Sequence, residues 1–335
     1  MRVLQRTGVS LVALAVAGMP LVAASPASAA STAGGSAASI VPCLTDLASP
    51  ALARTSGNEE NLSKWRERAD HTKVTQRDLD AVPPVETTRR SRTLEVEPDL
   101  AERIWIPVYV HVIKGTHRGE RTPAGPRRVK RLIRVLNLGM AGDQNRRQVD
   151  LRYRFSLRKI DYTRRDGWHH AFFNGPRDQR MKRALHRGNE RTLNLYINGG
   201  PRNEPVLGWS RFPWQYSSAP RLDGVSVTTA SLPGGRARGY NLGDTVIHET
   251  GHWLGLFHTF QGGCGLPTEG DQVADTPAED EPGDERCDPT RDTCELDEGF
   301  DPVRNFMDYS PDACMDHFTK LQGKRIDIAF EQYRS

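Results

Sequence analysis

The chain has 335 residues, a net charge of +4 and 37% hydrophobic residues, which is enough material for one large domain or two modest ones with a buried core. The charge is uneven, because residues 248–335 contain 20 acidic and 7 basic residues, a balance of −13 that leaves +17 for the rest. The basic residues are scattered through apolar periodic segments without a recognisable nucleic-acid-binding motif, so we expect no nucleic-acid partner. The carboxylate-rich, cysteine-bearing end is better suited to hard cations or basic substrates.

The first residues are typical of a secretory signal peptide. Two arginines precede an apolar run from Val9 to Ala24, and alanines in A-x-A spacing follow at positions 27 and 29. The run is shorter than a bilayer requires and is interrupted by Pro20, so it is not expected to anchor the chain. We therefore predict a cleaved signal peptide over residues 1–29 and a secreted protein without a membrane anchor.

Residues 30–95 form the next segment, which is first rich in Ala, Ser and Gly and then charged. It lacks the apolar density for a core of its own. We interpret it as a propeptide or flexible leader, followed by one catalytic domain over residues 96–335.

The expected elements of this domain mix strands and helices. A run rich in β-branched and aromatic residues predicts a buried strand over 104–113, and apolar residues at helical spacing predict a helix from about residue 126 to 141. Alternating apolar and basic residues predict a half-exposed strand over 151–160, and shorter strands are expected at 192–197 and 223–232. A helix follows from Thr245 through Leu254, with Asp244 as its N-cap. This order is that of an α+β protein.

The cysteines are also unevenly distributed. Cys43 stands alone near the start of the exported chain, and four others lie in the last quarter: Cys264, Cys287, Cys294 and Cys314. Disulfides persist outside the cytoplasm, so the cluster predicts two disulfides and one leftover thiol. The spacing alone leaves all three pairings of the four clustered cysteines open.

The stretch HETGHWLGLFH carries three histidines at metal-binding spacing. His248 and His252 are about one helical turn apart, so both imidazoles project from the same face of the expected helix. Glu249 lies beside that face, close enough to contact a water on a bound ion without being a ligand. Gly255 can end the helix in the left-handed conformation, so that His258 returns as a third ligand.

Three neutral imidazoles with an open fourth position are typical of a catalytic zinc site. Zinc lowers the pKa of its water to about 7, and Glu249 is then expected to act as general base and later as general acid. The alternative is a surface helix with solvated histidines, and five fixed positions would match the pattern by chance on the order of once in ten thousand chains.

A second motif follows in NFMDYS, which contains Met307 and Tyr309. HExxHxxGxxH with a downstream methionine turn resembles the metzincin zinc peptidases. The longer matches, HETGHWLGLFHTF, GDQVADTP and NFMDYSPDACMDHFT, resemble the pappalysin family within them. The resemblance is dense over residues 244–326 and looser from Ile104 onward.

This resemblance implies a metzincin fold, with a twisted mixed sheet that has an antiparallel edge strand, a backing helix, the active-site helix and an irregular, disulfide-bearing C-terminal subdomain. Residues 223–232 would be the edge strand, which pairs with an extended peptide or protein substrate. Met307 would form a hydrophobic floor under the zinc, and Tyr309 would stabilise the oxyanion or bind the metal. The alternative for both residues is packing in the core.

The resemblance also implies the pairs Cys264–Cys294 and Cys287–Cys314 and a structural calcium. Hard oxygen ligands for calcium would come from Asp271, Asp275, Thr276 and Glu279, for which a solvated acidic loop is the alternative. Cys43 is expected either to occupy the fourth zinc position and keep a zymogen latent or to be a leftover thiol.

We therefore predict a secreted zinc endopeptidase with one catalytic zinc ion. An acidic pocket from Asp312 or Asp316 would favour a basic residue after the scissile bond. The alternatives are a secreted adhesion or binding module that retains the metal only for structure, and a zinc hydrolase of non-peptide amides or esters. Glu249 argues against the first alternative and the edge strand against the second. The oligomeric state does not follow from the sequence.

Overall fold

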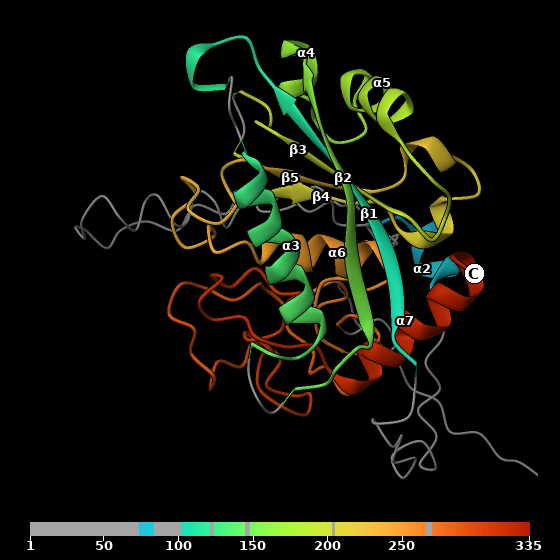
Figure 1. Cartoon of the computed structure of the whole chain (residues 1–335). Helices are drawn as coiled ribbons and strands as arrows, with labels where there is room; N and C mark the ends of the chain where they lie inside the picture. The colour runs from blue at the N-terminus through green and yellow to red at the C-terminus, as the bar shows by residue number, and fades with distance from the viewer. Residues whose placement is uncertain (1–73, 84–101, 121–123, 145–147, 203–204, 266–269) are drawn as a thin grey trace, which may run out of the picture. The chain divides into compact units, whose positions relative to one another are not determined.

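The computed structural model describes residues 74–83, 102–120, 124–144, 148–202, 205–265 and 270–335 (Figure 1). All of them belong to a compact unit that spans residues 54–335. The predicted signal peptide and Cys43 lie outside the described residues.

A five-stranded mixed sheet forms the centre of the unit (Figure 1). Its strands are β1 (Ile104–Lys114), β2 (Tyr153–Arg164), β3 (Leu193–Asn198), β4 (Gly208–Trp209) and β5 (Val225–Thr228). The strand order is β2-β1-β3-β5-β4, and all neighbours are parallel except β4, which runs antiparallel to β5. The predicted mixed sheet with an antiparallel edge strand is confirmed.

The edge strand is not the one that was predicted. Residues 223–232 contain β5, which lies inside the sheet between β3 and β4, and all four of its residues are buried. The antiparallel edge is β4, which has only two residues. A strand of this length has no periodicity that a sequence pattern can detect, and the uninterrupted apolar character of β5 is that of an interior parallel strand.

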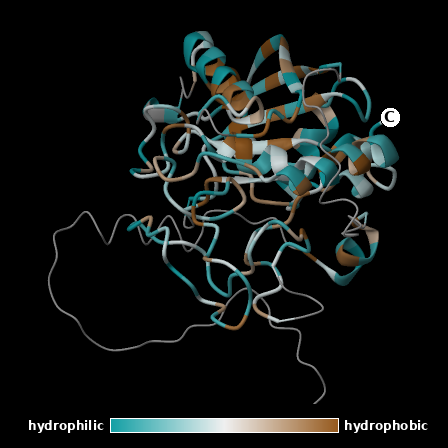
Figure 2. Cartoon of the chain, turned by 90° about the horizontal axis from the view of Figure 1, so that it is seen from below, coloured by the Kyte–Doolittle hydropathy of each residue, from teal (hydrophilic) through white to brown (hydrophobic). Residues whose placement is uncertain are grey.

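Apolar side chains lie on both faces of the sheet. The backing helix α3 (Pro126–Met140) and the helix α6 (Thr245–Trp253) pack on one face together with α7 (Lys320–Tyr333), and one large core cluster joins them to the strands. On the other face a smaller cluster contains Ile113, Tyr196 and Met181, which comes from α5 (Pro176–Leu185). The short α4 (Asp166–His169) precedes α5. Figure 2 shows the hydrophobic residues concentrated in these strands and helices.

A buried ion pair fixes the end of α6 to the C-terminus of the chain. Both nitrogens at the tip of the Arg334 guanidinium lie 3.1 Å from carboxylate oxygens of Asp223, which precedes β5. The indole of Trp253, the last residue of α6, donates to the same carboxylate at 2.8 Å and stacks under the guanidinium at 3.6 Å. Each buried charge therefore has a partner, which is the condition for keeping it inside a protein.

Part of the predicted leader is folded. Helix α2 (Gln76–Ala81) has Thr75 at its N-cap position, whose N–H and hydroxyl donate to Asp78, and it packs beside a short 3-10 helix at residues 213–215. The buried carboxylate of Asp78 accepts hydrogen bonds from Trp214 and Gln215, both at 2.8 Å. Leu79 of the helix and Val82, which directly follows it, add an apolar contact with the aromatic cluster there. This short segment therefore has a tertiary contact that its polar composition did not predict.

The region between α6 and α7 is irregular. Its described residues contain only turns, bends and one isolated bridge between Asn305 and His317. Two disulfides cross it, Cys264–Cys294 and Cys287–Cys314, which is the pairing that the family resemblance implies. The second disulfide ties the loop around residue 287 to the segment that follows Met307.

Candidate active site

The active-site helix α6 begins at a carboxylate from a distant part of the chain. Asp244 occupies the N-cap position, but its side chain makes no capping hydrogen bond. Asp312 accepts instead from the backbone N–H groups of Leu242 and Gly243, at 2.7 and 3.0 Å, and more weakly from that of Asp244 at 3.4 Å. A negative charge at this end also stabilises the helix dipole.

The end of α6 turns the chain back toward the metal-binding face. Gly255 has a φ of +103°, and a Cβ there would lie 2.9 Å from the Cβ of Ala329 in α7. Glycine is therefore required both by the left-handed backbone and by the close approach of α7. The chain then reverses, and His258 returns to face the helix, as the sequence predicts.

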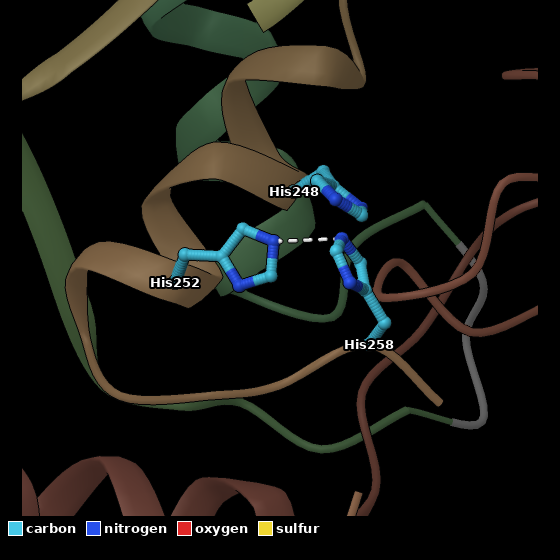
Figure 3. A group of neighbouring side chains, drawn as sticks. All are labelled: His248, His252 and His258. Carbon is cyan, nitrogen blue, oxygen red and sulfur yellow. Dashed lines mark hydrogen bonds between the residues drawn. The ribbon is translucent and has the colours of Figure 1, made fainter. Parts of the chain in front are cut away.

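The three histidines converge on one point (Figure 3). His252 Nε2 lies 3.1 Å from His258 Nε2, and one ring nitrogen from each of the three histidines falls within 4.8 Å of the others. All three side chains are buried. The two histidines of α6 come from one face of the helix, and His258 comes from the loop below it (Figure 3).

Backbone carbonyl groups fix which nitrogen each helical histidine presents. His248 Nδ1 lies 2.7 Å from the carbonyl oxygen of Phe306, and His252 Nδ1 lies 2.7 Å from that of Leu256. A carbonyl only accepts, so both Nδ1 atoms carry the proton and both Nε2 atoms keep their lone pair. Ligands on a tetrahedral zinc with bonds of about 2.0–2.1 Å are about 3.3 Å apart. The donor set and its spacing therefore fit zinc.

Glu249 lies between the metal-binding face and the sheet edge. Its side chain is fully buried and lines a pocket together with His248. A Cβ at Gly208 of β4 would lie 2.6 Å from Glu249 Oε1. The edge strand can therefore pass this close to the carboxylate only because residue 208 is glycine, a role that nothing in the sequence around Gly208 indicated.

Met307 and Tyr309 come from the turn below the helix. Met307 is fully buried, and a Cβ at Gly251 would lie 2.4 Å from its sulfur, so the thioether packs directly under α6 at the residue before His252. Tyr309 is half-buried, and its hydroxyl lies 3.2 Å from His258 Nε2. The Tyr309 hydroxyl therefore contacts the metal-binding group, and the Met307 thioether lies against the active-site helix; the zinc-site floor and the catalytic role stay predictions.

A pocket opens beside Glu249. Its lining residues are Leu207, Tyr240, Thr245, His248, Glu249, Asp308, Tyr309, Ser310, Asp312 and Met315. Asp312 is 3% exposed, and its Oδ1 has no hydrogen-bond partner among the described residues. Burial raises the pKa of Asp312 to about 6. Asp316, the other predicted pocket residue, instead pairs with Arg304 and accepts from Gln148, and it does not line the pocket.

The predicted calcium ligands do not share one centre. The carboxylate of Asp271 accepts from the amide of Gln322, whereas Asp275 accepts from the backbone N–H of Leu321. Glu279 pairs with Arg291. Among the described residues these three carboxylates form no common metal-binding group. Thr276, the remaining predicted ligand, is buried. Burial, together with Asp308, raises the pKa of Glu279 to about 10.

No helix of the described residues is both long and apolar enough to cross a membrane.

Comparison with known proteins identifies relatives of the chain. Residues 178–331 match the family model described as Pregnancy-associated plasma protein-A. An extracellular metalloprotease of Pyricularia oryzae is 37% identical over 235 residues, which cover 69% of this chain and 76% of the relative. Another, Extracellular metalloprotease 1 of Coccidioides posadasii, is 35% identical and covers 71% of this chain and 80% of that protein.

The chain is also similar to solved structures of mirolysin. Mature mirolysin of Tannerella forsythia in complex with a cleaved peptide is 26% identical, with a TM-score of 0.56, over 69% of this chain and 92% of mirolysin. Mirolysin in complex with compound 9 is 27% identical, with a TM-score of 0.58, over 69% and 93% of the two chains. The chain therefore belongs to the family of Pregnancy-associated plasma protein-A, the pappalysins, and is an extracellular zinc-dependent endopeptidase of metzincin fold.

Proposed function

We propose that His248, His252 and His258 hold the catalytic zinc through their Nε2 atoms and that Glu249 moves the proton. The observation that carries this proposal is the convergence of three buried imidazole nitrogens beside a buried carboxylate, in a pocket next to the sheet edge. When bound, zinc supplies a Lewis acid that polarises a carbonyl and lowers the pKa of water.

The proton transfers follow from the position of Glu249. The carboxylate takes a proton from the attacking water, whose oxygen forms a bond to the carbonyl carbon of the substrate. Glu249 then gives that proton to the peptide nitrogen as the carbon–nitrogen bond breaks. Tyr309 is close enough to the metal-binding nitrogens, with its hydroxyl 3.2 Å from His258 Nε2, to donate to the developing oxyanion or to bind the metal. Met307 supports the helix from below.

The substrate is proposed to bind as an extended strand along β4. This strand is the edge of the sheet and lies next to Glu249. It pairs with β5 on one side, and a peptide could pair with its other side. A peptide that adds to an edge strand forms main-chain hydrogen bonds that are independent of side-chain identity, and pockets then select individual side chains. The pocket that contains Asp312 is the proposed site for a basic residue after the scissile bond. Asp312 Oδ1, which has no hydrogen-bond partner within the described part of the chain, supports that preference.

Structural calcium is proposed with Glu279 as its best-supported ligand. Glu279, Asp301 and Asp308 are buried carboxyl groups, of which Asp301 and Asp308 both act electrostatically on Glu279, and Arg291 pairs with Glu279 and Asp301. Burial of these groups near one guanidinium disfavours their full ionisation, as the raised pKa of Glu279 shows, and a bound cation would stabilise the ionised carboxylates. Asp271, Asp275 and Thr276 remain predicted ligands without this support.

The domain boundaries and the latency thiol are proposed from the sequence. Residues 1–29 would be removed as a signal peptide, and residues 30–95 would be a leader that contains Cys43. Two disulfides use the other four cysteines, so Cys43 is the thiol left over. Because thiolate is a good zinc ligand, we propose that Cys43 occupies the fourth zinc position until the leader is removed.

Glu249→Gln tests the proposed proton transfer. Glutamine keeps the size of the side chain but cannot accept the proton, so kcat/KM for a peptide substrate is expected to fall about 100- to 10,000-fold. The zinc content, measured by elemental analysis, is expected to equal that of the parent. Glu331→Gln on the exposed face of α7 is the matched control. Normal hydrolysis by Glu249→Gln would show that the mechanism is wrong.

Asp312→Asn tests the proposed preference. The asparagine oxygen still accepts from the backbone at the start of α6, while the negative charge is removed. The measurement is cleavage-site profiling on a denatured protein. For the parent and the Asp316→Asn control, Arg and Lys are expected to be enriched directly after the cleaved bond. For Asp312→Asn this enrichment is expected to be several-fold lower. If the parent shows no such enrichment, the preference does not exist.

Calcium binding is expected to raise the melting temperature. Protein dialysed into zinc-containing, calcium-free buffer is titrated with calcium and followed by circular dichroism. The parent and a Glu281→Gln control, whose side chain is exposed, are expected to gain stability, and Glu279→Gln is not. A parent whose melting temperature ignores calcium would refute the proposal.

Cys43→Ala tests latency. If the thiolate blocks the zinc, the uncleaved variant is expected to hydrolyse peptides while the uncleaved parent does not. Gel electrophoresis of both samples, run before and after the assay, verifies that the leader is still attached. A Cys43→Ala zymogen as inactive as the parent would rule out the thiol as the latency device.

A further inference from the structure

A second group of metal-binding side chains lies away from the active site. Glu120, His169 and His170 each present a ligand atom within 4.8 Å of the others, and none of them lines the active-site pocket. Glu120 belongs to the 3-10 helix at Arg118–Glu120 that follows β1, and the two histidines lie at the end of α4, which follows β2. The group therefore sits beyond the carboxyl ends of adjacent parallel strands (Figure 1).

The histidine rings are held as they are in the active site. His169 Nδ1 lies 2.8 Å from the carbonyl oxygen of Ile113, and His170 Nδ1 lies 3.1 Å from that of Gly200, just beyond β3. Both Nδ1 atoms therefore carry a proton, and both Nε2 atoms are directed to other partners. The same arrangement orients His248 and His252, and it is the usual outer contact of a metal-binding histidine.

The backbone is shaped around these rings. A Cβ at Gly199 would lie 2.3 Å from His169 Nε2 and 2.7 and 2.8 Å from the two ring carbons next to it. A position this close to all three atoms lies over the ring face and not along the lone pair of Nε2. Gly199 therefore lets the chain lie flat on the imidazole of His169, which is 3% exposed, while the edge of the ring stays directed toward its neighbours.

One contact in the group requires a positive charge. His170 Nε2 lies 3.2 Å from Glu120 Oε1, and a lone pair and a carboxylate oxygen repel each other at this distance unless a proton or a cation lies between them. A proton on His170 would satisfy this pair alone. It would leave the nearby His169 unexplained, because the Nδ1 of that ring donates to the carbonyl of Ile113 and its Nε2 therefore has a lone pair to offer within the same group.

We propose that Glu120, His169 and His170 bind a second divalent transition-metal ion, with zinc as the ion expected in an exported protein. Two imidazole nitrogens and one carboxylate oxygen form a donor set that zinc accepts. Asp166 Oδ1 lies 3.9 Å from His170 Nε2, but it accepts a hydrogen bond from the Thr116 hydroxyl at 3.1 Å and is not one of the three converging ligand atoms. Arg202 lies 3.6 Å from the other oxygen of Asp166 and 3.9 Å from Glu120 Oε1, and it offsets part of the negative charge.

The ion would have a structural role. It would join the loop after β1 to the end of α4, and the contact of His170 with Gly200 would extend this brace to the loop after β3. All three loops follow the carboxyl ends of parallel strands, so one ion would fix them relative to one another. A glutamate in the ligand set and the absence of these residues from the active-site pocket distinguish this site from the catalytic one.

Zinc stoichiometry of the full chain tests the proposal independently of activity. After dialysis into zinc-containing buffer and removal of free metal, the parent is expected to hold two zinc ions. His170→Gln and Glu120→Gln are each expected to hold one and to retain the catalytic zinc. His317→Gln, at a partly exposed histidine outside the group, is the matched control and is expected to keep two.

A second experiment separates this site from the catalytic one. His252→Gln removes a ligand from the catalytic site, so cobalt added to the metal-free variant is expected to bind only at the second site. The bound cobalt is expected to give visible absorption bands of a four-coordinate site and to raise the melting temperature. Both effects should disappear in His252→Gln/His170→Gln. One zinc ion in the parent and no loss of zinc in His170→Gln would overturn the proposal and leave an imidazolium–carboxylate pair in this corner. Neither result depends on whether Glu249 is the general base.

Discussion

The hydrogen bond between His248 Nδ1 and the carbonyl oxygen of Phe306 joins the active-site helix to a turn 58 residues further along the chain. It fixes the tautomer of His248, and it also fixes the distance between α6 and the turn below it. The turn is held in its own right, because Met307 N–H donates to the side chain of Asn305 at 2.9 Å and Phe306 N–H donates to the carbonyl of His317 at 2.9 Å. The positions of the methionine under the helix and of Tyr309 beside the third histidine follow from this one junction.

The acidic residues of the last quarter serve mainly to hold loops in place. The carboxylate of Asp308 accepts from the N–H of Gly283, that of Asp301 from the N–H of Thr293, and that of Asp312 from the start of α6. In a region without regular secondary structure these bonds satisfy backbone groups that strands or helices would otherwise pair. The charge of −13 in residues 248–335 therefore does not by itself indicate a cation site. Where several carboxyl groups are buried together, as around Glu279, either protons or a cation must neutralise part of their charge.

The sequence predicted what local spacing determines. His248 and His252 are four residues apart on one helix, so their common face follows from helix geometry alone, and the strands β1, β2 and β3 follow from apolar patterns in the chain. The two-residue strand β4 and the cap of α6 by Asp312 could not be predicted, because each depends on a contact between segments that are distant in sequence. For the same reason Gly208 gave no signal, since its need to be glycine arises only from the side chain of Glu249 that lies against it.

The two histidine groups illustrate why one site was visible in the sequence and the other was not. Neighbouring residues on a helix point about 100° apart, so His169 and His170 would not share a face if the helix continued. The helix α4 ends at His169, and His170 has a φ of −103° and a ψ of 33°, which lie outside the helical region, so regular helix spacing does not apply to this pair. Their centroids are 4.8 Å apart with the rings nearly perpendicular, as are those of His248 and His252 at 4.8 Å. A regular helix and a helix end therefore reach the same relation between two imidazoles, and only the regular helix leaves a repeat that a motif can describe.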